Sequence, residues 1–401
     1  MRGNGGVVAY LTTATVTRTA GETAGPALLL VGIAVLASNS AGPYLVAALT
    51  GAAALAGPVI GALLDRARRP IQGFAASIVV FAVGLAAIAL LIGAAPLWLL
   101  LVIAAIAGLG YPGITGAWTA QLPHLVRPEH LHRAYTADAG TYSLASIIGP
   151  PVAAALLTVS GKAPLWLPVA LLLIGLATLR FVRIPTREHA VEHSLASDLR
   201  HGIGTILRRA ALRQAVVVTT VSFIGQAALF VTAPLLTQQL TGSLALTGFV
   251  FGAVALGGVV SVAIMMRFPI RRPDRIVVLG TAANAVCLLI AGFAPSFAVL
   301  LIAAFVLGLT EVPQLSAAFQ IRSRESAPRV RAQVFTTASS LRTTAFAIGS
   351  AAFGAMLGLG IPAVILGGFA LYLVSLAWGL LIGPRAMRRR RERGSTRTLG
   401  A

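Results

Sequence analysis

The chain has 401 residues, of which 57% are hydrophobic and only 10% are charged, and its mean hydropathy is +0.88. Soluble domains carry about a quarter of charged residues, so this composition excludes a soluble globular protein and requires lipid around most of the surface. The net charge of +20 does not indicate a nucleic-acid-binding protein, because the arginines lie in short segments between apolar runs.

The apolar runs have the length of membrane-spanning helices. Most contain about the 20 residues that are needed to cross the hydrocarbon core. The expected spans are 11–37, 44–64, 71–92, 97–121, 135–157, 165–181, 214–240, 244–266, 276–293, 297–321, 333–357 and 361–382. No cleavable signal peptide is evident, so we expect the first span to remain. The sequence therefore predicts an all-α membrane protein with twelve transmembrane helices.

The charges support this count because they alternate between the two sides of the membrane. The segments after every second span are rich in arginine, and of the intervening segments only one carries a basic residue, Lys162. Basic residues are enriched in cytoplasmic loops. We therefore expect both termini in the cytoplasm, and the basic tail near anionic lipid and disordered.

A charged turn separates the second and third spans. It contains Gly61, Asp65, Arg66, Arg68 and Arg69. A charged membrane loop is one interpretation. The residues also resemble the loop motif between helices two and three of the major facilitator superfamily. The resemblance implies a secondary transporter with a cargo site between two six-helix bundles, reached by alternating access. It also implies that the carboxylate and arginines hold the outward-facing state by docking on the other bundle.

An internal repeat with an offset of 200 residues supports two similar halves. Gly108 corresponds to Gly308 and Gly149 to Gly349, and the register holds from the first span to the eleventh. We expect two pseudo-symmetric six-helix bundles, which is the fold of the major facilitator superfamily. The predicted units are the bundles 1–182 and 214–384, a cytoplasmic linker 183–213 with an amphipathic helix, and a basic tail 385–401.

Three acidic residues fall inside apolar runs, where a charge costs about 2.5–3.5 kcal/mol on insertion scales. Glu22 follows Arg18 by four residues, so the two share a helix face. They form either a neutralising ion pair or a site in which Glu22 faces the cavity and binds a proton or a cation. Asp138 is close to Arg133 in sequence and is expected at the membrane interface.

The third acid is Glu311, which is followed by Pro313 in the tenth span. Proline frees a backbone carbonyl and can bend the helix, so Glu311 is either a proton or substrate site or a hydrogen-bonded structural acid. Arg342 is a candidate counter-charge for one of the three acids. Few uncharged polar side chains are available for a cavity, namely Gln226, Gln238 and Asn284, which favours an apolar cargo.

Gly149 and Pro150 lie in the fifth span and partly resemble the antiporter motif of the superfamily. Ordinary close helix packing is the alternative explanation. The fourth span lacks the arginine that many antiporters of this family carry, because Ala104 stands at its place. This departure weakens the case for proton antiport.

Other chemistries find no support in the sequence. All six histidines fall in predicted cytoplasmic segments, and the single cysteine, Cys287, lies in an apolar run. There is no phosphate-binding loop for ATP, and we expect neither a cofactor nor a metal site. A membrane enzyme would need acids and histidines gathered at one membrane face.

The sequence thus favours a transporter that is not an enzyme. We expect proton-linked export of a small amphiphilic or drug-like compound by a monomer in a bacterial-type inner membrane. Uptake or facilitated diffusion of a polar metabolite is the alternative.

Overall fold

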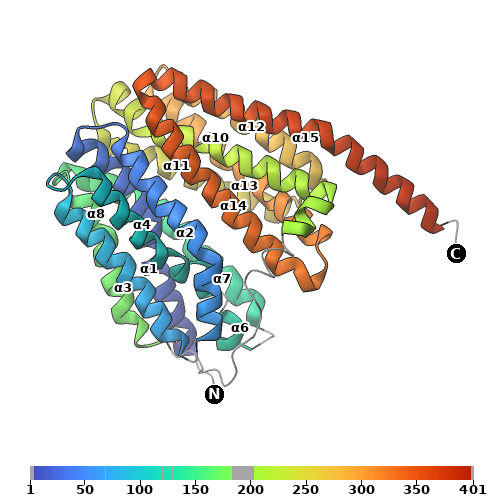
Figure 1. Ribbon diagram of the computed structural model, residues 1–401, viewed down its shortest axis with the longest axis horizontal. Helices are drawn as coiled ribbons and strands as arrows, with labels where there is room; N and C mark the ends of the chain where they lie inside the picture. The colour runs from blue at the N-terminus through green and yellow to red at the C-terminus, as the bar shows by residue number, and fades with distance from the viewer. Residues whose placement is uncertain (1–3, 68, 120, 128–129, 183–202, 399–401) are drawn as a thin grey trace.

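The computed structural model describes residues 4–67, 69–119, 121–127, 130–182 and 203–398. The regular elements in these ranges are all helices (Figure 1). The helices of the first half are α1 (Asn4–Leu36), α2 (Ala41–Arg66), α3 (Pro70–Leu91), α4 (Leu97–Ile114), α5 (Gly116–Thr119), α6 (Leu122–Leu125), α7 (Leu131–Ala155) and α8 (Ala163–Leu179). Those of the second half are α10 (Ala210–Thr241), α11 (Thr247–Arg267), α12 (Pro273–Gly292), α13 (Phe297–Glu325), α14 (Pro328–Met356) and α15 (Ile361–Thr398).

Within the described residues, ten helices are long and apolar enough to cross a membrane. The apolar helix α8 has 17 residues and falls just short, and α14 has 29 residues but carries several arginines. With these two, each of the twelve predicted spans corresponds to a helix. In lipid the backbone must satisfy its own hydrogen bonds, so long apolar runs form helices. The predicted all-helical membrane fold is confirmed.

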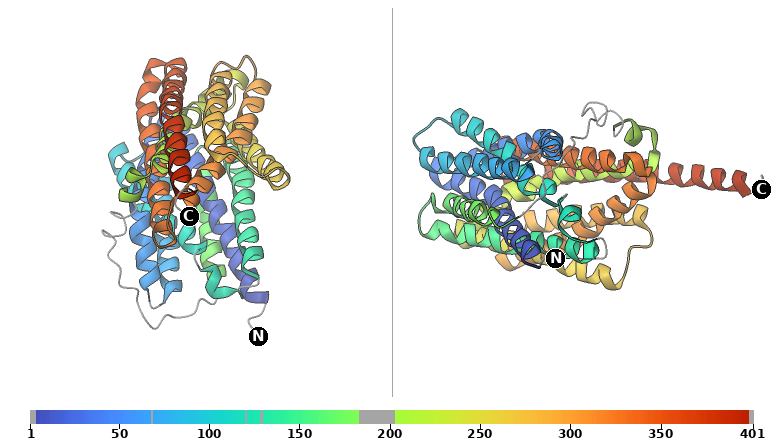
Figure 2. Two further views of the ribbon diagram at one scale, coloured as in Figure 1. Left: turned by 90° about the vertical axis from the view of Figure 1, so that its right-hand side faces the viewer. Right: turned by 90° about the horizontal axis from the view of Figure 1, so that it is seen from below.

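Several helix ends differ from the sequence prediction. Helix α4 ends at Ile114 instead of continuing to residue 121, and the short helices α5 and α6 follow it. Pro112 and Gly113 precede this break, and both residue types disfavour a continuous helix. The tail was predicted to be disordered, but α15 continues as a helix to Thr398 (Figure 2). Arginine is a good helix former, and extending an existing helix needs no new nucleus.

The two halves have the same internal arrangement. In the first half α1 contacts α7 and α8, and in the second α10 contacts α14 and α15. Helix α2 contacts α4 in the same way that α11 contacts α13. Gly108 lies against the backbone of α2 at Leu49, and Gly308 lies against the backbone of α11 at Val254. Small residues allow such close helix approach. The repeat found at an offset of 200 residues is therefore a repeat of helix packing.

The two halves contact each other at one end of the bundle and diverge at the other (Figure 1). The contacts are made by α2 with α14 and by α7 with α11. Pro43, near the start of α2, lies against Gly354 near the end of α14, so this end is the one where α2 begins. We call it the closed end, and the opposite end, which carries the loop between α2 and α3, the open end.

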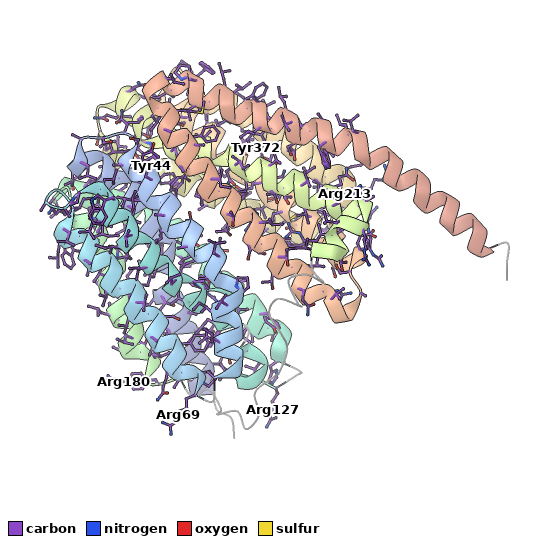
Figure 3. The ribbon with its side chains drawn as sticks, viewed as in Figure 1. Tyr44, Arg69, Arg127, Arg180, Arg213 and Tyr372 are labelled. Atoms are coloured by element: carbon purple, nitrogen blue, oxygen red, sulfur yellow. The ribbon has the colours of Figure 1, made fainter. Side chains whose placement is uncertain are left out.

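Arginines of the first half gather at the open end. Figure 3 shows Arg69, Arg127 and Arg180 there, whereas Tyr44 lies toward the closed end. The positive-inside rule predicts that such an end faces the cytoplasm.

The linker prediction is only partly within the described residues. Residues 183–202 lie outside them, so most of the expected amphipathic helix is not described. Residues 203–208 are helical, and Ile206 is buried among Leu212 and Val216 of α10 and Val334 and Ala338 of α14. The end of the linker therefore packs against the second half.

Candidate functional site: a cavity between the two halves

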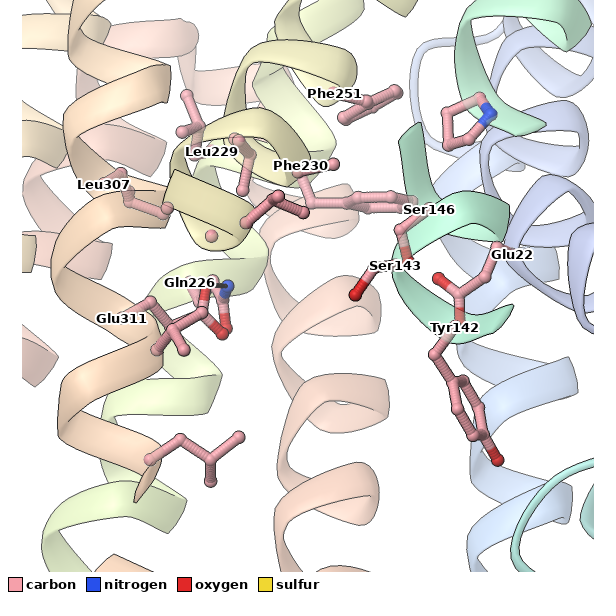
Figure 4. Close-up of a pocket in the computed structure, with 18 of the residues that line it drawn as sticks. Glu22, Tyr142, Ser143, Ser146, Gln226, Leu229, Phe230, Phe251, Leu307 and Glu311 are labelled. Atoms are coloured by element: carbon pink, nitrogen blue, oxygen red, sulfur yellow. Dashed lines mark hydrogen bonds between the residues drawn. The ribbon is translucent and has the colours of Figure 1, made fainter. Parts of the chain in front are cut away.

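A cavity of about 640 Å³ lies between the two halves. Its walls come from α1 and α7 of the first half and from α10, α11, α13 and α14 of the second. Most of the lining is apolar, and its polar members stand on opposite walls (Figure 4). These polar members are Glu22, Tyr142, Ser143, Ser146, Gln226, Glu311 and Arg342. The volume lies within the range of about 300–1,000 Å³ that is usual for small-molecule sites.

The wall of the second half carries an acid with two polar neighbours. The Gln226 Nε2 group donates a hydrogen bond to Glu311 Oε2 at 2.6 Å. The Arg342 guanidinium lies 4.4 Å from the centroid of the Phe223 ring and within electrostatic range of Glu311. A buried charge is tolerated when it has an opposite charge and hydrogen bonds nearby. The charge of Arg342 acts on Glu311 from a distance, because no ion pair or hydrogen bond joins the two side chains.

The wall of the first half carries Glu22 beside α7. Glu22 lies close to Tyr142, Ser143 and Ser146, and the Ser146 side chain is the polar group that interacts with its carboxylate (Figure 4). Among the described residues, no basic side chain lies within ion-pair distance of Glu22. Neither cavity acid forms an ion pair with a described basic side chain; Glu311 accepts a hydrogen bond from the amide of Gln226, whereas Glu22 has only hydroxyl groups beside it.

Arg18 does not pair with Glu22, contrary to one of the two interpretations of their spacing. Its NH1 group lies 2.7 Å from Asp138 Oδ1 on α7, and both side chains are almost fully buried. Asp138 therefore pairs with Arg18 of α1 and not with Arg133, its neighbour in sequence. Asp138 accepts hydrogen bonds from both guanidinium amino groups and from Tyr10 and Thr119. This multiple, charge-assisted contact is stronger than a single ion pair between neighbouring turns.

The predicted helix-bend residues lie at or near the cavity. Pro150 lines it, and Gly149 lies against α1 at Thr19 and Thr23. Close packing of α7 on α1 therefore explains the small residue at position 149. Pro313 lies inside α13, two residues after Glu311, and the helix continues through it.

Two of the three uncharged polar candidates lie elsewhere. Asn284 is buried inside the second half, where it accepts a hydrogen bond from Thr310 and donates one to Gln314. Gln238 is exposed near the end of α10. Only Gln226 lines the cavity. Polarity in a span does not by itself show which face of the helix carries it.

Aromatic residues of the cavity were missed by sequence reasoning. Phe230 lies with its ring centroid 5.2 Å from that of Phe251 and 5.3 Å from that of Phe346. Phe223, Gln226 and Phe230 share one face of α10, because they are spaced by three and four residues. This spacing was the available signal, but lipid-facing residues show the same pattern.

The charged loop motif is described only in part. Gly61 lies in α2, and Arg69 is exposed at the N-terminal cap of α3. Arg68 and the side chains of Asp65 and Arg66 lie outside the described residues. The loop lies at the open end, where Figure 3 shows Arg69.

Two equivalent helical halves around a shared cavity are the architecture of many secondary transporters. The family profile of the Major Facilitator Superfamily matches residues 8–273, which is more than half of the chain. The chain therefore belongs to the major facilitator superfamily and is a secondary transporter, not an enzyme.

Solved structures show the same fold. A bacterial homologue of the human lysosomal transporter Spinster, inward-facing and unoccupied, matches with a TM-score of 0.72 and 12% identity, over 96% of this chain and 98% of that one. The human organic anion transporter MFSD10 matches with a TM-score of 0.67 and 16% identity, over 94% and 99%. The nucleoside transporter NupG matches with a TM-score of 0.71 and 11% identity, over 95% and 99%. A comparison with curated protein sequences gave no significant match.

Proposed function

We propose that this transporter exports a small amphiphilic, drug-like compound in exchange for protons. The observation that carries the proposal is the composition of the cavity: an aromatic and aliphatic lining with one acid whose carboxylate has neither a basic nor an amide partner among the described residues. Glu22 is that acid, and its wall faces Glu311 and Gln226 across the cavity (Figure 4).

The apolar lining favours an amphiphilic cargo over a polar metabolite. Phe223, Phe230, Phe251 and Phe346 all line the cavity, as do aliphatic side chains of α11 and α13. Burial of apolar surface contributes roughly 25 cal/mol per Å², so a lipophilic compound gains affinity along most of this surface. A sugar or nucleotide would lose hydrogen bonds to water and find few replacements, which is costly.

Glu22 is proposed as the group that carries the coupling proton. Ionised Glu22 in the apolar cavity can bind a cationic group of the cargo. Protonated Glu22 is neutral, so it needs no cation and can stay without bound cargo. Cargo and proton then compete for one carboxylate, which couples their movements. Glu311 is less suited to this role, because Arg342 and Gln226 already stabilise its ionised form.

The charged loop is proposed as the cytoplasmic gate. Gly61, Asp65, Arg66, Arg68 and Arg69 would dock on the second half when the open end closes, and separate in the state described above. In this proposal the protein is a monomer of a bacterial-type cytoplasmic membrane, with both termini in the cytoplasm. Pro150, at the cavity wall, would allow α7 to adjust as the halves move.

Transport in inverted membrane vesicles tests the function. A panel of lipophilic cations should accumulate when the vesicle interior is acidified, and should not accumulate without the gradient. Glu22→Gln keeps the size of the side chain and should abolish the gradient-driven part, with Glu311→Gln as the matched control on the opposite wall. Unchanged transport by Glu22→Gln would remove Glu22 from the coupling step. Cargo that moves only in the opposite direction would favour uptake.

A further inference from the structure

A buried ion pair lies behind the cavity wall of the first half. The Arg18 guanidinium donates to Asp138 Oδ1 at 2.7 Å and Oδ2 at 3.2 Å, to the Asp138 backbone carbonyl at 2.9 Å, and to Thr119 Oγ1 at 2.8 Å. It also donates to the hydroxyl of Thr141. Tyr10 donates to the same carboxylate at 2.7 Å. Neither charged residue lines the cavity.

Arg18 nevertheless lies next to the cavity acid. It precedes Glu22 by one helical turn, so the two side chains emerge from the same face of α1. Tyr142 connects the two positions, because its ring centroid is 3.8 Å from the Arg18 guanidinium carbon and it lines the cavity with Glu22. The Tyr142 hydroxyl is within electrostatic range of both charged groups.

Two carboxylates, those of Asp138 and Glu22, are therefore positioned to pair with Arg18. Asp138 provides two carboxylate oxygens and a backbone carbonyl, and the neighbouring hydroxyls of Thr119 and Thr141 accept further hydrogen bonds. Such bidentate contacts are the strong ones for arginine. Replacing the Asp138 carboxylate with an amide would leave a buried cation without a counter-charge, which is strongly unfavourable. Glu22 is the carboxylate one turn away on the same helix face.

We propose that Asp138 is a positioning residue that holds Arg18 away from Glu22 and thereby leaves the cavity carboxylate available to a proton or a cationic cargo. The inference deepens the proposed function and rests on it for its biological meaning, but its physical content is the pairing of Arg18. The inference also explains why the Arg18–Asp138 ion pair is buried although neither residue lines the cavity.

The ionisable groups around Glu22 are few enough for a clear test. Arg18 is on its own helix, Tyr111 is on α4, and Tyr142 is on α7. Glu311 and Arg342 lie on the opposite wall of the cavity. Of these, only Arg18 is a cation that shares the helix of Glu22, so a change in its pairing should dominate the ionisation of that carboxyl.

A lipophilic carbodiimide can report this ionisation, because it reacts with protonated carboxyl groups in apolar surroundings. We would label the full chain in native membranes and quantify modification at residue 22 by peptide mass spectrometry over a range of pH. An adjacent arginine favours the ionised form of a carboxyl by a factor of about 10 to 1,000. Asp138→Asn should therefore label Glu22 at least about tenfold more slowly than the parent at the same pH.

Two further variants separate positioning from a merely structural role. The Arg18→Gln/Asp138→Asn double variant removes both charges and should restore the parent labelling rate and pH profile. Asp138→Glu retains the charge and should also label at the parent rate. Where Asp138→Asn does not insert into the membrane, Asp138→Ser provides a second neutral variant with room for water. A general loosening of the bundle would hydrate Glu22 and also slow its labelling, but that slow labelling would persist in the double variant.

The outcomes are distinct from those of the transport assay. Parent-like labelling of Asp138→Asn, or slow labelling that persists in the double variant, would overturn the inference. If Glu22→Gln transports normally but the labelling behaves as expected, the proposed coupling role fails and the pairing of Arg18 stands.

Discussion

Closure of one end of the bundle depends on a contact that one added methyl group should disrupt. Gly248, in the first turn of α11, lies against α7 of the other half. A Cβ atom at this position would be 2.6 Å from Pro151 Cα and 2.8 Å from Ala154 Cβ. One of these atoms belongs to the backbone, so a small side-chain movement cannot relieve the overlap. Gly248→Ala should therefore separate the two helices at the closed end.

The expected size of the effect follows from the two states. Overpacking a close contact costs about 1–3 kcal/mol, and this cost applies only while α7 and α11 touch. The gain in helix propensity from glycine to alanine, about 1 kcal/mol, applies in both states and cancels. The population in which α7 and α11 are separated, relative to the population in which they touch, should therefore rise by about 5- to 150-fold.

Spin-label distances can measure the shift. Val159 and Leu359 are each 74% exposed and lie beside the closed end, one in each half, so cysteines there can carry the labels. The single native cysteine, Cys287, is replaced by serine first. Gly248→Ala should add a longer distance to the distribution. Gly140→Ala is the matched control, because nothing lies within 4 Å of an added Cβ at that position of α7. An unchanged distribution in Gly248→Ala would refute the argument.

Three other predictions use the gate, the orientation and the packing within one half. Asp65→Asn should shift cysteine accessibility toward the state that is open at the cytoplasmic end, and unchanged labelling would count against the gating role. Reporter fusions at either terminus should report a cytoplasmic location, and one external terminus would contradict the predicted number of spans. Gly308→Ala should lower thermal stability without favouring either state, because its contact with Val254 lies inside the second half; a shift in the spin-label distances would contradict this.

The conformation of the two halves, in contact at one end and apart at the other, shows how the proposed gate relates to the cavity. Helices α2 and α14, and α7 and α11, are in contact at the closed end, and the halves diverge toward the loop after α2. If the arginine-rich end faces the cytoplasm, the cavity is open to the cytoplasm. An exporter would load its cargo in this state, with Glu22 ionised and facing the cavity.

Much of the architecture follows from the sequence alone. Apolar runs of membrane length between arginine-rich loops fix the number of spans, because lipid forces each run to satisfy its backbone hydrogen bonds within one helix. The offset of 200 residues indicates the two equivalent halves, and the contacts of Gly108 and Gly308 show that repeated small residues mark repeated helix approaches. The sequence also indicates that the three acids within apolar runs are functional or paired, because a charge in lipid is energetically costly.

The pairing of these charges was decided by the tertiary structure. Spacing along α1 allowed Arg18 to pair with Glu22, but α7 packs on α1 at a rotation that brings Asp138 to Arg18 instead. Likewise Gln226 faces the cavity and Asn284 faces the core of the second half, although both are amides in apolar spans. Membrane insertion depends on the local sequence, whereas the rotation and depth of one helix against another depend on contacts between residues far apart in the chain. The sequence therefore determined what crosses the membrane, and the packing of the helices determined which side chains meet inside it.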